Sequence, residues 1–269
     1  MKLKVLVDNN TFIDMYYLGE PAVSYYIEDG DTKILFDTAY SDAFIKNADA
    51  MGIDLNNIDK LVISHGHDDH TKGLKYFFDE NIQKDIELIS HPDCFEYKED
   101  EKGLFIGSPL TKEELSRVCN LNLSASPIKI SENITFLGEI PESNDFEIRY
   151  SIGKRKVDNN ITTDYLKDDS AICYKSDKGL VIITGCSHSG ICNIIEYAKK
   201  VCNENRIYGV IGGFHLLDVN DKLEKTIEYL KDNDIKLLYP CHCVSLAAKI
   251  EMSKSLEIRE VGVGLELEF

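Results

Sequence analysis

A string of metal-ligating side chains is the most informative feature of this sequence. Residues 65–70 read His-Gly-His-Asp-Asp-His and follow a short apolar run. His65 and His67 lie two residues apart, so an extended or turning backbone can direct both imidazoles to one ion. Asp69 and His70 are adjacent and can diverge toward a second ion. Imidazole and carboxylate together suit zinc, iron or manganese, and two such ions ~3.5–4 Å apart form a clamp for hydrolysis.

Other histidines stand where short apolar runs end. His188, His215 and His242 each follow such a run, and Cys186 lies two residues before His188. At such a place His215 could donate a proton to a leaving group or steady a developing oxyanion, which would make it catalytic. Its alternative role is to support a metal ligand. His91 follows another run, and a role on the substrate side and a structural role both stay open.

The elements that must position these residues are short strands alternating with amphipathic helices. Runs of apolar and β-branched residues predict strands at 2–7, 22–28, 32–36, 60–64, 86–90, 171–175, 180–184, 207–211 and 236–239. Apolar residues at helical spacing predict helices at 41–51, 71–78, 191–202 and 222–233. Two β-rich halves, each followed by helices, predict packed sheets with helices outside.

We expect the whole chain, residues 1–269, to form one domain, because the periodicity resumes after its single irregular stretch. This stretch, from about residue 93 to 166, is rich in charged residues, Gly, Ser, Asn and Pro. A segment of this length inside a compact domain is usually functional or carries structure of its own. It predicts an irregular insertion or a lid.

The composition limits the partners. With 30 Lys and Arg against 47 Asp and Glu, the formal net charge is −17, which repels phosphate backbones and argues against nucleic acid. No apolar run approaches the ~20 residues of a membrane helix, so we expect no membrane association. The N-terminus lacks the apolar core of a signal peptide, so we expect a cytoplasmic protein. A small-molecule substrate fits best, and it can be anionic where bound metal reverses the local charge. The sequence does not determine the oligomeric state.

The eight cysteines are expected to be reduced. No Cys-x-x-Cys pair occurs, and in a long chain of this composition most thiols serve as small buried apolar groups. Cys186, Cys241 and Cys243 differ from the others because they lie beside histidines.

Residues 65–70 match the His-x-His-x-Asp-His signature of the metallo-β-lactamase superfamily, and the chain resembles that family on both sides of the motif. Segments 184–190 (Thr-Gly-Cys-Ser-His-Ser-Gly), 212–216 (Gly-Gly-Phe-His-Leu) and 240–243 (Pro-Cys-His-Cys) resemble one branch in particular. That branch comprises proteins similar to dihydropterin ribofuranosylaminobenzene 5′-phosphate synthase. The match also includes Leu-Phe-Asp-Thr at 35–38, and the next residue, Ala39, stands where the family usually has glycine. From about residue 93 to 166 the resemblance is patchy.

The resemblance implies an α/β (α+β) fold, a four-layer αββα sandwich with two metal ions at one edge of its sheets. It assigns His65 and His67 to the first ion, and Asp69, His70 and His242 to the second. Cys186 stands where many members have a bridging aspartate and one β-lactamase subclass has a cysteine ligand. As a thiolate ligand it would favour zinc, with iron or manganese as alternatives, and otherwise it is a buried thiol.

The third ligand of the first ion is missing from its usual place. Most members carry a histidine there, but residues 167–171 read Lys-Asp-Asp-Ser-Ala. We expect His188 to supply this ligand from its loop at a strand end. Asp168 and Asp169 are the alternatives.

The predicted function is that of a metal-dependent hydrolase with a dinuclear site. Its substrate would be a small ester, lactone, phosphoester or pterin-related compound, and a pterin-pathway synthase-like activity stays open. Asp69 would orient the nucleophile as well as bind metal. The alternative is a metal-retaining sensor or binding protein. A di-iron redox enzyme is disfavoured, since redox members of the superfamily carry Glu at the position of His67. The basic residues 154–156 could meet an anionic substrate or simply lie in solvent.

Overall fold

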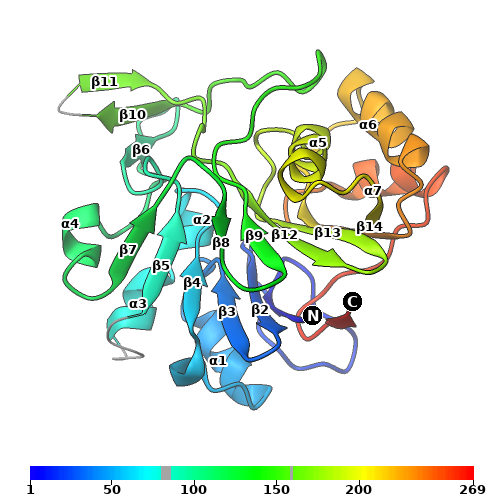
Figure 1. Ribbon diagram of the computed structural model, residues 1–269. Helices are drawn as coiled ribbons and strands as arrows, with labels where there is room; N and C mark the ends of the chain where they lie inside the picture. The colour runs from blue at the N-terminus through cyan, green and yellow to red at the C-terminus, as the bar shows by residue number, and fades with distance from the viewer. Residues whose placement is uncertain (80–85, 158–159) are drawn as a thin grey trace.

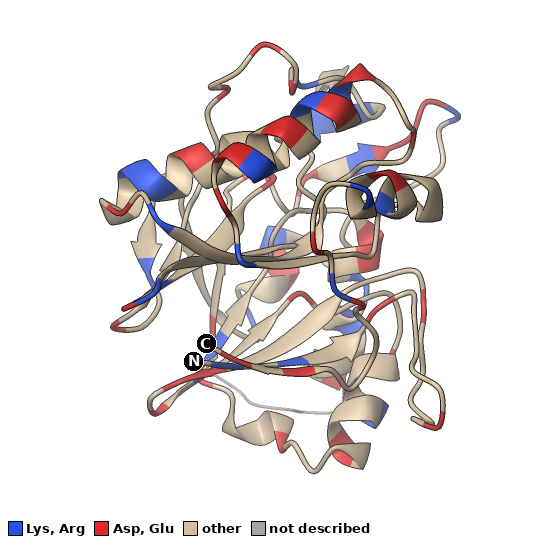
Figure 2. Ribbon diagram, turned by 90° about the vertical axis from the view of Figure 1, so that its right-hand side faces the viewer, with Lys and Arg blue, Asp and Glu red and all other residues tan. Residues whose placement is uncertain are grey.

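Two β-sheets face each other, and helices cover their outer faces, giving the four layers of an αββα sandwich (Figure 1). The computed structural model describes residues 1–79, 86–157 and 160–269. Strands between the helical layers are mostly uncharged, whereas the outer helices carry many charged residues (Figure 2). This arrangement follows from the sequence, because apolar strands need cover on both faces.

The first sheet has seven strands in the order β16-β1-β2-β3-β4-β5-β7. It begins with antiparallel strands and continues with the parallel strands β3, β4, β5 and β7. The strands are β1 (Lys2–Val7), β2 (Ser24–Asp29), β3 (Thr32–Phe36), β4 (Lys60–Val62), β5 (Glu87–Ser90), β7 (Asn120–Leu123) and β16 (Glu266–Glu268).

The second sheet has six strands in the order β15-β14-β13-β12-β9-β8. Strands β13, β14 and β15 run parallel, so their carboxyl ends meet at one edge. The strands are β8 (Ile128–Lys129), β9 (Ile134–Phe136), β12 (Ala171–Ser176), β13 (Gly179–Thr184), β14 (Ile207–Gly213) and β15 (Leu237–Cys241).

Three apolar clusters hold the layers together. One lies between the sheets and joins side chains of both, such as Phe36 and Ile183. A second packs α1 (Ala43–Ala50) and α3 (Leu74–Asp79) on the first sheet. A third packs α5 (Ile191–Cys202), α6 (Asp221–Asp232) and α7 (Leu246–Ser253) on the second sheet.

Most predicted elements are present, with differences that have local causes. The helix predicted over 71–78 is divided into α2 (Asp68–Thr71) and α3. Gly73 lies at the break, where its backbone N–H donates to the Ala39 carbonyl oxygen at 3.0 Å. A Cβ there would come within 1.8 Å of the Thr38 carbonyl oxygen, so this close approach to the loop after β3 requires glycine. The sequence analysis did not predict α7 or the short edge strand β16.

The segment expected as an insertion, residues 93–166, divides between the sandwich and a separate sheet. Strands β7, β8 and β9 belong to the two main sheets. Strands β6 (Tyr97–Glu99), β10 (Lys154–Val157) and β11 (Asn160–Thr163) form a three-stranded sheet, and α4 (Lys112–Leu115) precedes β7. Residues 93–166 therefore do not form a single insertion between elements of the sandwich. The sequence analysis missed the strands in this segment because short strands with few apolar residues give a weak sequence signal.

Among the described residues, none of the helices is long and apolar enough to cross a membrane.

Candidate metal centre

Three histidines from two loops converge beside the ends of β4 and β13. His65 and His67 follow β4, and His188 lies in the turn after β13. The His188 ring lies 4.9 Å from the ring of His65 and 4.9 Å from that of His67, measured between centroids. One ligand atom from each residue lies within 4.8 Å of the others. The structure thus brings together His65 and His67, two of the three histidines of the motif, and His188, the further ligand expected from the sequence.

The chemistry of this histidine cluster fits a metal ion. The Nε2 atoms of His65 and His67 and both ring nitrogens of His188 are buried without a hydrogen-bond partner. Burial lowers the pKa of His67 to about 4, and burial also lowers the pKa of His65 and His188 well below the usual value. All three imidazoles are therefore neutral at pH 7, the form that binds metal. Unpartnered buried nitrogens are costly unless something occupies the space between them.

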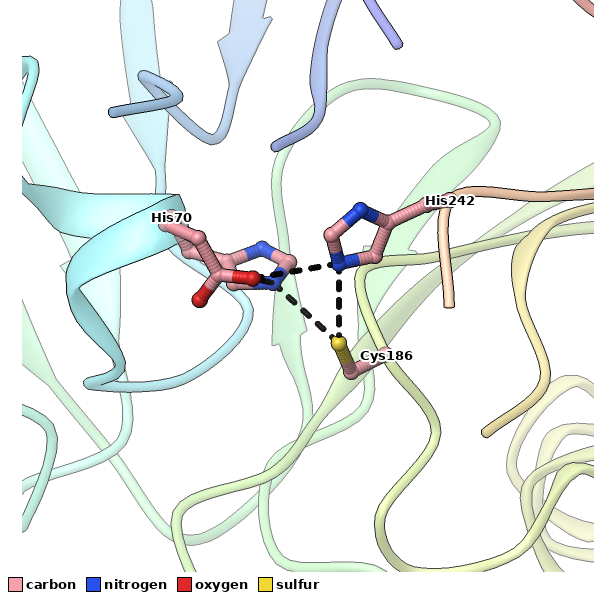
Figure 3. Close-up of side chains that lie close together, drawn as sticks. His70, Cys186 and His242 are labelled. Carbon is pink, nitrogen blue, oxygen red and sulfur yellow. Dashed lines mark hydrogen bonds and ion pairs between the residues drawn. The ribbon is translucent and has the colours of Figure 1, made fainter. Parts of the chain in front are cut away.

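A second cluster lies beside the first and consists of Asp69, His70, Cys186 and His242. The Cys186 Sγ atom lies 3.3 Å from His70 Nε2 and 3.1 Å from His242 Nε2 (Figure 3). An Asp69 carboxylate oxygen lies 3.2 Å from His242 Nε2 and 3.5 Å from His70 Nε2. One carboxylate, one thiol and two imidazoles therefore point at a common space, the donor set that zinc accepts.

Polar residues behind this second cluster orient its histidines. Asp37, directly after β3, lies 2.7 Å from His70 Nδ1 and accepts hydrogen bonds from the backbone N–H and hydroxyl of Ser64. On the other side, Asp8 accepts from the backbone N–H of His242, and Asn9 Oδ1 lies 3.2 Å from His242 Nδ1. Such partners determine which ring nitrogen faces the metal.

A buried ion network supports the loop that carries the first cluster. Lys98 on β6 is fully buried, and its Nζ lies 2.7 Å from Asp164 and 2.9 Å from Asp168. The other oxygen of Asp168 accepts a hydrogen bond from the backbone N–H of Gly66, at 2.8 Å. A Cβ on Gly66 would lie 1.9 Å from the Cys94 carbonyl oxygen, so this position requires glycine.

The alternative ligands Asp168 and Asp169 have other hydrogen-bond partners, while Asp169 Oδ1 is buried without one. Asp168 binds Lys98 and Gly66, as described above. One oxygen of Asp169 accepts from the backbone N–H and the hydroxyl of Ser189, at 2.8 and 2.6 Å. Asp169 thereby supports the turn that presents His188, and neither aspartate belongs to the histidine cluster.

His215 lies beside the centre, at the end of β14. Its ring centroid is 4.3 Å from that of His188 and 6.1 Å from that of Tyr150. It has a positive φ of 48°, as do His242 (50°) and Ser187 (60°). Left-handed backbone at non-glycine residues is costly, and it gathers where side chains must be aimed at a site.

The remaining sequence candidates lie elsewhere. His91 accepts at Nδ1 from the backbone N–H of Asp93, and its Nε2 lies 3.8 Å from Glu139. It belongs to none of the metal-ligating clusters formed by the described residues. The basic residues 154–156 lie on β10, where Arg155 pairs with Asp93 and both lysines are exposed.

Two hollows border the centre. One, of about 440 Å³, is lined by Pro21, Tyr40, His67, Asp68, Asp69 and Ile106. The other, of about 320 Å³, includes Tyr150, His215 and Lys222 in its lining, and the His215 ring lies 4.3 Å from that of His188. The first hollow includes His67 and Asp69 in its lining, so a small molecule there can reach a member of each cluster.

Several contributing residues escaped the sequence analysis. Asp8 and Asn9 directly follow β1 and could have been found by the rule that polar residues at strand ends gather at one edge. Lys98 carries no such signal, because only the packing of the small sheet buries it. Cys243 was singled out beside a histidine but received no role.

Comparisons with known proteins agree with this geometry. The family model described as the metallo-beta-lactamase superfamily matches residues 18–242. A protein of Methanocaldococcus jannaschii named 7,8-dihydropterin-6-methyl-4-(beta-D-ribofuranosyl)-aminobenzene-5'-phosphate synthase is 32% identical over 93% of this chain and 89% of its own. An uncharacterised protein of the same organism is 33% identical over 94% of both chains.

Among solved structures, Tm1679 is described as a metal-dependent hydrolase of the β-lactamase superfamily. It superposes with a TM-score of 0.86 at 28% identity, over 100% of this chain and 99% of that one.

Proposed function

Because the chain belongs to the metallo-β-lactamase superfamily, we propose that it is a metal-dependent hydrolase with two ion sites acting on a small molecule. The observation that carries the proposal is the convergence of the two clusters. His65, His67 and His188 would hold the first ion, and Asp69, His70, Cys186 and His242 the second. The unpartnered nitrogens of the histidine cluster support this assignment.

Bound divalent ions would supply a water of lowered pKa and positive charge for the developing anion. The protein contributes orientation and access. The Asp69 side chain remains 27% exposed beside the hollow that contains Tyr40 and Ile106. Its second carboxylate oxygen can therefore accept a hydrogen bond from an attacking water and hold it toward a substrate.

The substrate class we propose is a small ester, lactone or phosphoester. A net charge of −17 discourages polyanions at long range, whereas two dications would make the pocket locally positive. The apolar and aromatic lining of Pro21, Tyr40 and Ile106 suits the body of a small organic molecule better than a polymer.

A second candidate is a synthase activity on pterin-related compounds. It is supported by the relative at 32% identity, whose name describes such a synthase. The same ion sites would serve either reaction, so the two candidates are distinguished by which substrate the protein converts.

The test begins with metal analysis of reduced, purified protein, followed by removal with a chelator and reconstitution with Zn²⁺, Mn²⁺ or Fe²⁺. Each form is assayed on panels of esters, lactones and phosphoesters, and on dihydropterin with a phosphorylated ribofuranosyl aminobenzene. We expect turnover that disappears on chelation, returns with metal and is abolished in Asp69→Asn. Protein that binds no stoichiometric metal would refute the proposal, and product formation only with the pterin pair would favour the second candidate.

A further inference from the structure

We propose that Cys186, His215 and Cys243 form a third metal site, which takes a thiophilic divalent ion such as Zn²⁺ and shares the Cys186 sulfur with the second ion site. One ligand atom from each of these three residues lies within 4.8 Å of the others. The inference rests on the proposed function in one respect only: Cys186 would be a ligand both of this third site and of the proposed second ion site.

The three side chains come from the ends of three neighbouring parallel strands. Cys186 follows β13, His215 follows β14, and Cys243 follows β15. Because these strands end at the same edge, the three residues meet without any long loop. The convergence of Cys186, His215 and Cys243 therefore follows from strand order alone and does not depend on the motif at residues 65–70.

The local packing makes room for the second sulfur. The Cys243 Sγ atom lies 3.4 Å from the Cys186 carbonyl oxygen. A Cβ on Gly213 would lie 2.5 Å from that sulfur, so the glycine leaves the space that the thiol occupies. The Nδ1 atom of His215 is buried without a hydrogen-bond partner, as the nitrogens of the histidine cluster are.

The donor set decides the class of ion. Two sulfurs and one imidazole nitrogen are softer than the ligands of the other two clusters, and such sets select zinc over magnesium, calcium or manganese. Cys186 also lies within 3.3 Å of both His70 and His242, so its sulfur is placed to bridge two ions. His215 and Cys243 are both partly exposed, which leaves a path for the ion to enter.

In this arrangement His215 is a metal ligand. This role is an alternative to the sequence-based predictions that His215 donates a proton, steadies an oxyanion or supports a metal ligand. A ligand and a proton donor can be distinguished by experiment. Loss of a ligand removes an ion and its bonds to sulfur, whereas loss of a proton donor slows turnover and leaves the metal content unchanged.

The experiment measures Zn²⁺ content after equilibrium dialysis in the presence of a reductant, and follows thiolate-to-metal charge transfer during titration of metal-free protein with Cd²⁺ or Co²⁺. Wild-type protein is compared with Cys243→Ser, Cys243→Ala and His215→Ala. Cys202→Ser is the matched control, because Cys202 is a partly buried thiol at the end of α5, away from the three clusters. Circular dichroism verifies that each variant is folded.

We expect three ions in the wild type and in the control, and two ions in each variant of Cys243 or His215. The charge-transfer band should fall to roughly a third in Cys243→Ser, because one sulfur–metal bond of three remains. Two ions in the wild type, with no change in these variants, would overturn the third site and leave the proposed function intact. Wild-type protein without bound metal would overturn both. If a Cys243 variant fails to fold, His215→Ala decides by the same measurements.

Discussion

The buried ammonium group of Lys98 and the carboxylate of Asp168 form an ion pair at 2.9 Å that connects the small sheet to the metal-site loop. Lys98 is on β6, and Asp168 accepts a hydrogen bond from Gly66, between two of the clustered histidines. Both side chains are fully buried. Burial raises the pKa of Asp168, but Lys98 and the Gly66 N–H outweigh it and lower that pKa below its ordinary value of 3.8.

Replacing Lys98 with methionine should lower the free energy of unfolding by about 3–5 kcal/mol at pH 7, because it leaves carboxylates buried without a cation. Denaturant unfolding measures this. Lys112→Met is the control, since the Lys112–Glu96 pair is partly exposed and should contribute less than about 1 kcal/mol. Equal losses in the two variants would contradict the prediction.

The same variant should show a reversed pH dependence. In the wild type the lowered pKa of Asp168 contributes stability that is present above pH 3.8 and lost as the pH falls through the lowered value. Without Lys98, burial raises the pKa of Asp168, so protonation relieves the buried charge as the pH falls. The stability difference between Lys98→Met and wild type should therefore narrow from pH 7 to pH 5. A constant difference would show that Asp168 does not titrate in this way.

His188→Ala should remove one metal ion, because His188 is the third member of the histidine cluster. His91→Ala is the matched control: His91 is also a buried histidine at a strand end whose Nε2 makes no hydrogen bond, but it lies outside the clusters. Metal content by mass spectrometry decides. If the two variants retain the same number of ions, His188 is not a ligand.

Asp37→Asn should weaken metal binding about 10–100-fold at the second site, because Asp37 orients His70 through its Nδ1 atom. Asp29→Asn serves as the comparison. Asp29 is also buried and hydrogen-bonded, but its partners Ser131 and Asn133 lie outside the metal-ligating clusters. Competition titration with a chromophoric chelator measures the affinities, and a similar weakening in both variants would argue against the role of Asp37.

Gly66→Ala should destabilise the protein by more than about 2 kcal/mol and weaken metal binding, because its Cβ would overlap the Cys94 carbonyl. Gly30→Ala provides the contrast. Gly30 has a φ of 59° and open space around it, so alanine there costs about 1 kcal/mol through the backbone alone. Thermal unfolding and metal content should separate the two, and intact metal binding by Gly66→Ala would contradict the expected clash.

Local patterns were enough to predict much of the sandwich and part of the centre. The apolar runs of β3, β13 and β14 and the helical spacing in α5 depend on neighbouring residues, so they can be recognised without the fold. The motif at residues 65–70 is equally local, because its ligands lie within six consecutive residues. The family comparisons confirm the recognition and the fold class.

The sequence favoured His188 over Asp168 and Asp169, but only the tertiary structure brought His188 next to His65 and His67, since this depends on how the turn after β13 faces the loop after β4. It also placed Lys98 beneath that loop and brought Cys243 next to Cys186. These contacts join residues that are far apart in the chain, so the local hydrophobic periodicity of the sequence cannot predict them. The sequence by itself determined which residue types can bind metal and which strands they follow. The packing of the two sheets determined which of the residues meet, because it brings the ends of β4 and β13, which belong to different sheets, to one edge of the sandwich.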